Sequence, residues 1–176
     1  NHVVSGVLQE ALEAVGAPAY DEEDFKLARA FFYDGVSPEE LEAKKAAIKK
    51  KFGPALAETF YEKPLDTHIA PLAWKGEIQS GSSDVGDASY VMPTAWLSTA
   101  TATLGTAGHT WQMAAHGNTG IAHKAMLTAG KVLALAAVRF YEEPELAEAA
   151  KKELAEETGG VYECPIPKEI GPRLED

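Results

Sequence analysis

The sequence predicts an α/β fold in which a mixed sheet is flanked by helices. Near both ends of the chain, apolar residues recur at intervals of three and four, which is typical of amphipathic helices. Two segments in the middle, 68–72 and 95–104, instead carry the alternation and the β-branched residues of strands. The 176 residues are enough for one domain of ordinary size.

Two helices are expected at the start of the chain. Apolar residues from His2 to Val15 fall on one helical face, and Gly16 ends that pattern. Asp21 is a suitable N-cap for a second helix with acidic residues in its first turn, because a carboxylate there accepts free backbone N–H groups. Gly35 follows the last apolar residues of this second helix.

A third helix has the clearest start signal in the sequence. Ser37 and Glu40 have the spacing of a capping box, and Pro38 between them suits the first helical position. The helix should end near the lysines at 49–51, which favour the negative end of its dipole. These lysines are interpreted as a solvated helix end, with an anion-binding patch as the alternative.

The segment 52–109 changes character, and no helix is expected there. It is rich in proline, glycine and serine, and it contains both predicted strands. Between the strands, residues 81–87 form a polar loop that contains glycine. After residue 109 the helical pattern returns: residues 119–141 are apolar on nearly every side and should form a buried helix. A charged helix should follow from Pro144 to Glu156.

Composition argues against several classes of function. With 16 basic and 27 acidic residues, the formal net charge of −11 repels nucleic acids and anionic membranes. The longest apolar run, 132–138, is much shorter than the roughly 20 residues that cross a bilayer. The single cysteine, Cys164, excludes an internal disulfide and fits a cytoplasmic location.

Five histidines are candidate general bases or metal ligands, since imidazole serves in both roles: His2, His68, His109, His116 and His123. His109 is the strongest candidate because it follows a predicted strand and lies among glycines that permit close backbone approach. His123, inside the predicted buried helix, is expected to make a hydrogen bond in the core.

The loop at 81–87 offers further candidates. Asp84 and Asp87 are three residues apart and could bind a cation or an amine, although their spacing alone favours a role in capping turns. Ser82 has no nucleophile-elbow motif around it, so serine catalysis is not expected. Motifs for phosphate or dinucleotide binding are absent from the sequence.

Three blocks of sequence, at 81–94, 104–112 and 121–126, resemble in order and spacing the C-terminal part of the B-subunit group of p-aminobenzoyl-glutamate hydrolases. This group belongs to the metal-dependent amidohydrolases and peptidases related to aminoacylase and carboxypeptidase G. The first helix and the tail are also similar, so the resemblance covers essentially residues 1–176. It implies the C-terminal segment of a zinc-peptidase-like catalytic domain, after an inserted dimerisation domain that this chain lacks.

The resemblance also implies roles for individual residues. His109 matches the last metal ligand of the family, whose members bind two zinc or manganese ions. Asp84, Asp87, Ser82 and Gly108 match positions near the substrate or the metal ligands. The other ligands and the catalytic glutamate would precede the inserted domain, so no catalytic residue is assigned within this chain.

The chain is therefore expected to be part of a cytoplasmic hydrolase that uses metal-activated water. The expected substrate is the amide bond of an N-acyl amino acid, such as p-aminobenzoyl-glutamate, or of a short peptide. Two-metal hydrolysis needs several ligands and a base, so the chain alone should be inactive, which would fit a cloned or proteolysed fragment of the enzyme. The resemblance implies a homodimer through the missing domain, and a second subunit is a further candidate partner. Two departures from the family, His116 and Ala125, bear on substrate preference. A non-catalytic ligand-binding or assembly domain and a purely structural α/β domain remain as alternatives.

Overall fold

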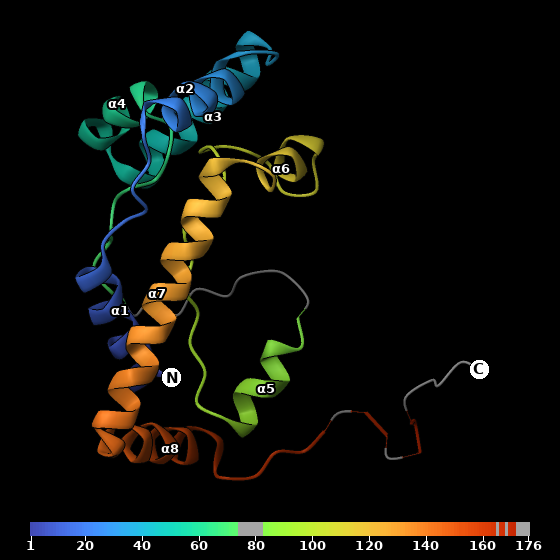
Figure 1. Cartoon of the computed structure of the whole chain (residues 1–176). Helices are drawn as coiled ribbons and strands as arrows, with labels where there is room; N and C mark the ends of the chain where they lie inside the picture. Colours follow the sequence, from blue (N-terminus) through green and yellow to red (C-terminus); the bar gives the residue numbers. More distant parts are fainter. Residues whose placement is uncertain (74–82, 165, 168, 172–176) are drawn as a thin grey trace. The chain divides into compact units, whose positions relative to one another are not determined.

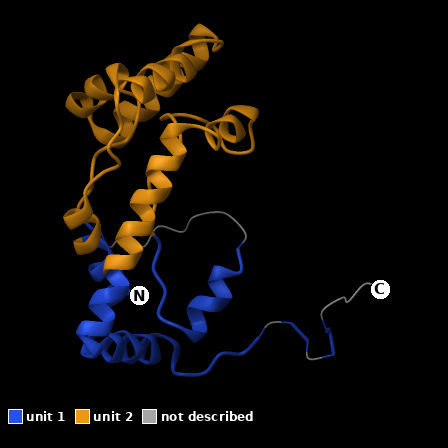
Figure 2. Ribbon diagram, in the orientation of Figure 1, with its two compact units in different colours: residues 1–9, 72–96, 136–176 blue, residues 10–71, 97–135 orange. Residues whose placement is uncertain are grey.

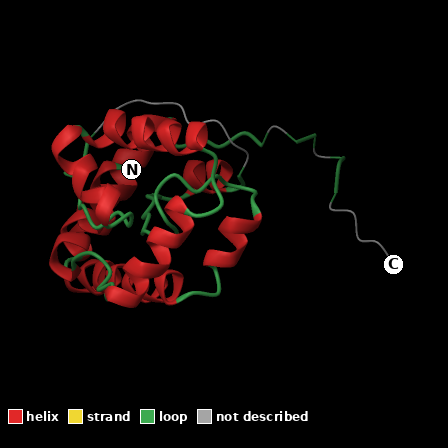
Figure 3. Ribbon diagram, turned by 90° about the horizontal axis from the view of Figure 1, so that it is seen from above, coloured by secondary structure: helices red, strands yellow, loops and turns green. Residues whose placement is uncertain are grey.

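The computed structural model describes residues 1–73, 83–164, 166–167 and 169–171. These residues form eight α-helices and no β-strand. Figures 1 and 3 show the helices and the loops that join them. The helices are α1 (His2–Val15), α2 (Glu22–Tyr33), α3 (Pro38–Phe52), α4 (Pro54–Glu62), α5 (Val85–Val91), α6 (Trp111–His116), α7 (Gly120–Glu142) and α8 (Pro144–Thr158). The predicted α/β fold with a mixed sheet is therefore wrong for the described residues.

Both predicted strands are irregular segments. A strand is stable only when its backbone groups pair with a neighbouring strand, and alternation of side chains does not supply that partner. In 97–104, the Leu104 N–H donates to the Pro64 carbonyl at 2.9 Å, and the Thr101 N–H turns back to the Thr99 carbonyl at 2.9 Å. These isolated bonds hold the segment without building a ladder.

The helices that carry clear end signals are confirmed. Asp21 caps α2 by accepting from the Asp24 N–H at 3.1 Å, and the Asp24 carboxylate returns a bond to the Asp21 N–H at 2.9 Å. Ser37 and Glu40 close the predicted capping box at the start of α3. Gly159 ends α8 in the left-handed conformation that favours glycine.

The sequence analysis missed α4 and α5, and it did not separate the short α6 from the helical pattern expected after residue 109. These helices have nine, seven and six residues, which is too short for a distinct apolar period. The N-cap of α4 is Gly53, which has no side chain to mark the start. The expectation of no helix in 52–109 is therefore wrong for α4 and α5.

The chain divides into two compact units, coloured separately in Figure 2. Unit 2 comprises residues 10–71 and 97–135 and contains two groups of buried side chains. In the first, Phe32 packs with Ile48, Ala57 and Phe60 from α3 and α4. The second joins Ala28, Leu65 and Ile121. Together they hold α2, α3, α4 and the start of α7, and Leu104 packs against the first group.

A buried carboxylate braces α2 against α7 in unit 2. Asp24 is only 6% exposed, and its Oδ2 accepts from Lys124 Nζ, which also bonds Asp21 Oδ2 at 2.6 Å. These hydrogen bonds to Asp21 and Asp24 raise the pKa of Lys124. Gly120 gives this carboxylate room, because a Cβ at that position would lie 2.9 Å from Asp24 Oδ1.

We expect Gly120→Ala to destabilise the protein by about 1–3 kcal/mol, because the Asp24 carboxylate must move away from its partners. The matched control is Gly130→Ala on the same helix, where a Cβ would meet nothing within 4 Å. That change should stabilise the helix by about 0.5–1 kcal/mol. Urea unfolding measures both, and equal effects of the two substitutions would contradict the proposed role of Gly120.

Unit 1 comprises residues 1–9, 72–96 and 136–176. Here the Glu153 carboxylate of α8 caps the start of α1, accepting from the His2 N–H at 2.5 Å and the Val3 N–H at 3.0 Å. Although partial burial opposes ionisation, these two bonds hold the pKa of Glu153 below its usual range. Asn1 Nδ2 adds a bond to the Ala150 carbonyl at 3.0 Å.

Helix α7 is confirmed as a helix, but it is less buried than predicted. Ile121, Ala125 and Val132 are fully covered, whereas Met126 and Leu127 are more than 60% exposed. By length and hydropathy this helix also meets the criteria for a membrane span, which the short apolar run at 132–138 did not suggest. Core helices of globular proteins meet the same criteria, so this observation carries no further conclusion.

Candidate functional site

The candidate site is the loop of unit 2 that joins residue 103 to α6 and carries His109. His109 has φ +57°, in the left-handed region, and it is the one residue other than glycine with a positive φ among those described. Gly108 precedes it, and both residues are exposed. A non-glycine residue in this conformation costs free energy, so the surrounding contacts must hold it there.

Thr110 fixes the end of this loop. Its side chain accepts from the Met113 N–H at 3.3 Å as the N-cap of α6, and its hydroxyl donates to the Ala107 carbonyl at 2.7 Å. These two bonds tie the backbone on both sides of His109. The imidazole is thus presented to solvent from a braced loop, as a ligand or a base requires.

His116 holds the other end of the loop from inside the protein. It is 1% exposed, and its Nδ1 lies 2.7 Å from the Gln112 carbonyl, so Nδ1 carries the proton. Nε2 must then accept, and it does so from the N–H of Thr103 at 3.2 Å and from the Thr103 hydroxyl at 2.9 Å. The imidazole ring also lies 4.0 Å from that of Phe31, centroid to centroid.

Burial lowers the pKa of His116, although its bond to the Gln112 carbonyl opposes this shift. The neutral imidazole is therefore the folded form. Since the folded pKa lies below that of the unfolded chain, the contribution of His116 to stability is present above about pH 6.5 and is lost as the pH falls through the folded pKa.

We accordingly expect the unfolding free energy of the wild type to fall more steeply between pH 7.5 and pH 5 than that of His116→Gln. Urea unfolding at each pH gives the two slopes. His123→Gln is the control, since His123 is exposed and its slope should match the wild type. Identical slopes for the wild type and His116→Gln would refute the assignment of a neutral buried imidazole.

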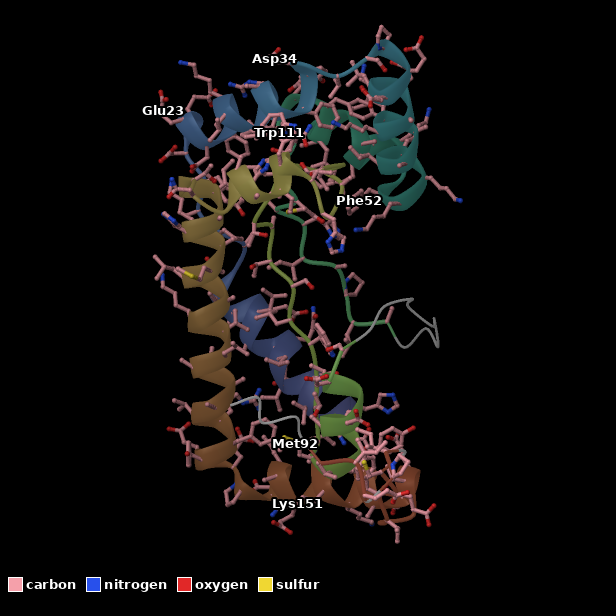
Figure 4. All side chains as sticks on the ribbon, turned by 90° about the vertical axis from the view of Figure 1, so that its right-hand side faces the viewer. Glu23, Asp34, Phe52, Met92, Trp111 and Lys151 are labelled. Atoms are coloured by element: carbon pink, nitrogen blue, oxygen red, sulfur yellow. The ribbon has the colours of Figure 1, made fainter. Side chains whose placement is uncertain are left out.

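A pocket opens beside the loop. Its volume is about 640 Å³, and it is lined by α2, α3, residues 105–107 and the start of α6. Trp111 stands at its edge with 72% of its surface exposed. Figure 4 labels Trp111 at the start of α6 and Asp34 at the end of α2, and both line the pocket. His109 is not among the lining residues, although its neighbours Ala107 and Thr110 are.

Two of the other predicted site residues, Asp84 and Asp87, belong to unit 1. Asp84 is the N-cap residue of α5, although its side chain makes no capping bond, and Asp87 lies in the first turn. Asp87 accepts from the Tyr162 hydroxyl at 2.7 Å, and this bond raises the pKa of Tyr162 to about 12. Ser82 falls outside the described residues. Among the described residues of the predicted set, Gly108 and His109 therefore share unit 2, and Asp84 and Asp87 share unit 1.

Potential metal ligands come together in one place among the described side chains. His2, Glu153 and Glu157 of unit 1 lie close enough to share an ion. Glu153 accepts hydrogen bonds from the first backbone N–H groups of α1. This capping role explains why Glu153 lies beside His2 without a metal ion. His109 belongs to no such group within the described part of the chain, so these residues do not complete a metal site around it.

Sequence reasoning placed the buried histidine wrongly. His123 was expected in the core but is exposed, whereas His116 is the histidine that makes buried hydrogen bonds. The signal that was available lies in the short helix itself: His116 follows Gln112 by four residues, the spacing at which a side chain reaches the carbonyl of the preceding turn.

The chain is 30% identical over 175 residues to the B-subunit of p-aminobenzoyl-glutamate hydrolase from Escherichia coli (strain K12). The match covers 98% of this chain and 36% of that protein, so the chain spans about a third of the length of its relative. No protein-family model and no solved structure match the chain. The similarity supports the resemblance to the B-subunit group that the three sequence blocks indicate, while leaving the metal dependence of this chain untested.

Proposed function

We propose that this chain is part of a hydrolase that cleaves the amide bond of an N-acyl amino acid such as p-aminobenzoyl-glutamate, or of a short peptide. The observation that carries the proposal is the 30% identity across nearly the whole chain to a protein named as one subunit of such a hydrolase. The braced, solvent-facing histidine of the 103–110 loop adds to it, since such a side chain is available to a ligand or to substrate.

The proposal includes two divalent metal ions, zinc or manganese, with His109 as one ligand. Such ions polarise the amide carbonyl and make water nucleophilic at neutral pH. As the family resemblance implies, the remaining ligands and the base would come from polypeptide outside this chain. The loop bonds of Thr110 and His116 would keep the His109 backbone in place before the metal binds.

We also propose that the complete protein assembles with other polypeptide chains. Because the relative is named as one subunit of its enzyme, a second subunit is expected in addition to a homodimer, and the single cysteine is consistent with the reducing cytoplasm. Gly108 would let substrate approach the backbone beside His109. Asp84, Asp87 and Ser82 are proposed to contribute near the substrate or the metal ligands in the complete protein.

The test is hydrolysis of a panel of N-acyl amino acids and dipeptides by the complete gene product, followed by the appearance of free amino groups. We expect hydrolysis that a chelator abolishes and that added zinc or manganese restores. The 176-residue chain, assayed in parallel, should be inactive. Hydrolysis that a chelator leaves unchanged would rule out the metal-dependent part of the proposal.

A non-catalytic binding or assembly domain is the second candidate. It is favoured because, among the described residues, His109 belongs to no group of potential metal ligands. A thermal shift of the complete gene product separates the two functions. A binding site for metal raises the unfolding temperature in proportion to the logarithm of metal concentration, and a domain without one shows no such rise.

A further inference from the structure

We propose that His2, Glu153 and Glu157 bind a zinc ion that joins the start of α1 to the end of α8. Each side chain offers one ligand atom, and these three atoms lie within 4.8 Å of one another. All three residues belong to unit 1, the blue part of Figure 2. The site uses none of the residues assigned to the hydrolase, so the inference goes beyond the proposed function.

The ends of two helices place the three side chains. His2 is the first residue of α1, and Glu153 and Glu157 are one turn apart on α8, so their carboxylates share a face of that helix. The Glu153 carboxylate caps α1 through the backbone N–H groups of His2 and Val3. Its Oε1 therefore lies 3.3 Å from His2 Nδ1, a nitrogen that can ligate a metal. The cap thus preorganises one carboxylate beside an imidazole.

The local charges favour a divalent cation. Although partial burial opposes ionisation, the two α1 N–H groups lower the pKa of Glu153, so its carboxylate is charged at neutral pH. Lys151 and Lys152 of the same helix pair with other carboxylates. Glu157 lies in the last turn of α8, where the negative end of the helix dipole favours a cation.

The donor set selects zinc over magnesium or calcium. One imidazole nitrogen and two carboxylate oxygens suit zinc, whereas the hard cations prefer oxygen ligands alone. Zinc bonds these atoms at about 2.0–2.2 Å, so small rotations of His2 and Glu157, which are exposed, bring all three atoms to one ion.

The surroundings leave room for a fourth ligand. Glu157 also lines a cavity of about 320 Å³ in unit 1, which can hold a water molecule to complete the usual four-coordinate shell of zinc. The ion would fasten together His2 and Glu153, which are 151 positions apart in the sequence. Its expected role is therefore structural.

The experiment is a zinc titration of the 176-residue chain carrying His109→Ala, so that the proposed hydrolase ligand makes no contribution. Isothermal titration calorimetry gives the stoichiometry and the affinity, and amide chemical shifts in ¹H–¹⁵N spectra locate the ion. We expect one zinc per chain, with shifts at Val3, Glu153 and Glu157. Magnesium at the same concentration should leave these amides unshifted.

Two variants and two controls test the assignment in the same background. His2→Ala and Glu157→Gln should each weaken zinc binding about tenfold or more, because each removes one of three protein ligands. Both variants keep the N–H groups that Glu153 caps, so they are expected to fold. His123→Gln changes an exposed histidine of α7, and Glu156→Gln changes the carboxylate next to Glu157; both should bind zinc as the parent chain does.

The proposal is overturned if millimolar zinc leaves the amides of Val3, Glu153 and Glu157 unshifted, if the shifts fall only elsewhere, or if His2→Ala and Glu157→Gln bind zinc as tightly as the parent chain. Because the titration needs neither His109 nor turnover, its outcome is independent of the hydrolase assay. Hydrolysis by the complete gene product without zinc binding here would remove this site alone, whereas zinc binding here without hydrolysis would remove the proposed function alone.

Discussion

Replacing His109 by alanine in the complete gene product is expected to lower the rate of amide hydrolysis by about a thousandfold or more and to reduce the bound metal. The physical reason is that a two-metal site that loses one imidazole ligand holds the affected ion weakly, and the carbonyl is no longer polarised. Metal analysis of the purified variant, together with kcat/KM, measures both effects.

The control for this prediction is His123→Ala, which removes another exposed histidine, on α7 of unit 2. Its activity and metal content should equal those of the wild type. A His109→Ala protein with full activity and full metal content would eliminate His109 as a ligand. The urea midpoint should change little in either variant, because both imidazoles are exposed.

Truncation of Phe32 should cause the largest loss of stability. Its side chain is fully buried with Ile48, Ala57 and Phe60, and alanine would leave a cavity among α2, α3 and α4. We expect Phe32→Ala to lower the unfolding free energy by about 3–5 kcal/mol, as is usual for a buried aromatic residue. Urea unfolding followed by circular dichroism measures the change.

Leu133→Ala is the matched control, since this α7 residue is 52% exposed and its loss opens no buried space. It should alter stability by less than about 0.5 kcal/mol. A similar loss from both substitutions would show that the group of side chains around Phe32 is not a cohesive core.

The sequence was sufficient where a local signal determines the structure. The Asp21 cap and the box of Ser37 and Glu40 each provide hydrogen bonds within one turn, so the starts of α2 and α3 follow from neighbouring residues alone. The glycine that ends α8 is similar, because its left-handed conformation is a property of that residue.

The sequence was insufficient where the structure depends on contacts between residues that are far apart in the chain. The alternation in 95–104 predicts a strand, but no described segment pairs with it, and Leu104 bonds to Pro64 instead. The same limit applies to the site. His109 was proposed because it follows a predicted strand and lies among glycines, and the described residues form no strand there. The pocket depends on Lys44 from α3 meeting the 105–112 loop, a contact that no sequence spacing reveals.

The most direct test of the account is the release of p-aminobenzoate from p-aminobenzoyl-glutamate by the complete gene product. We expect steady release that stops when a chelator is added and resumes when zinc or manganese is restored. Failure to release p-aminobenzoate with either metal supplied, from a protein shown to be folded, would contradict the assignment to this hydrolase activity.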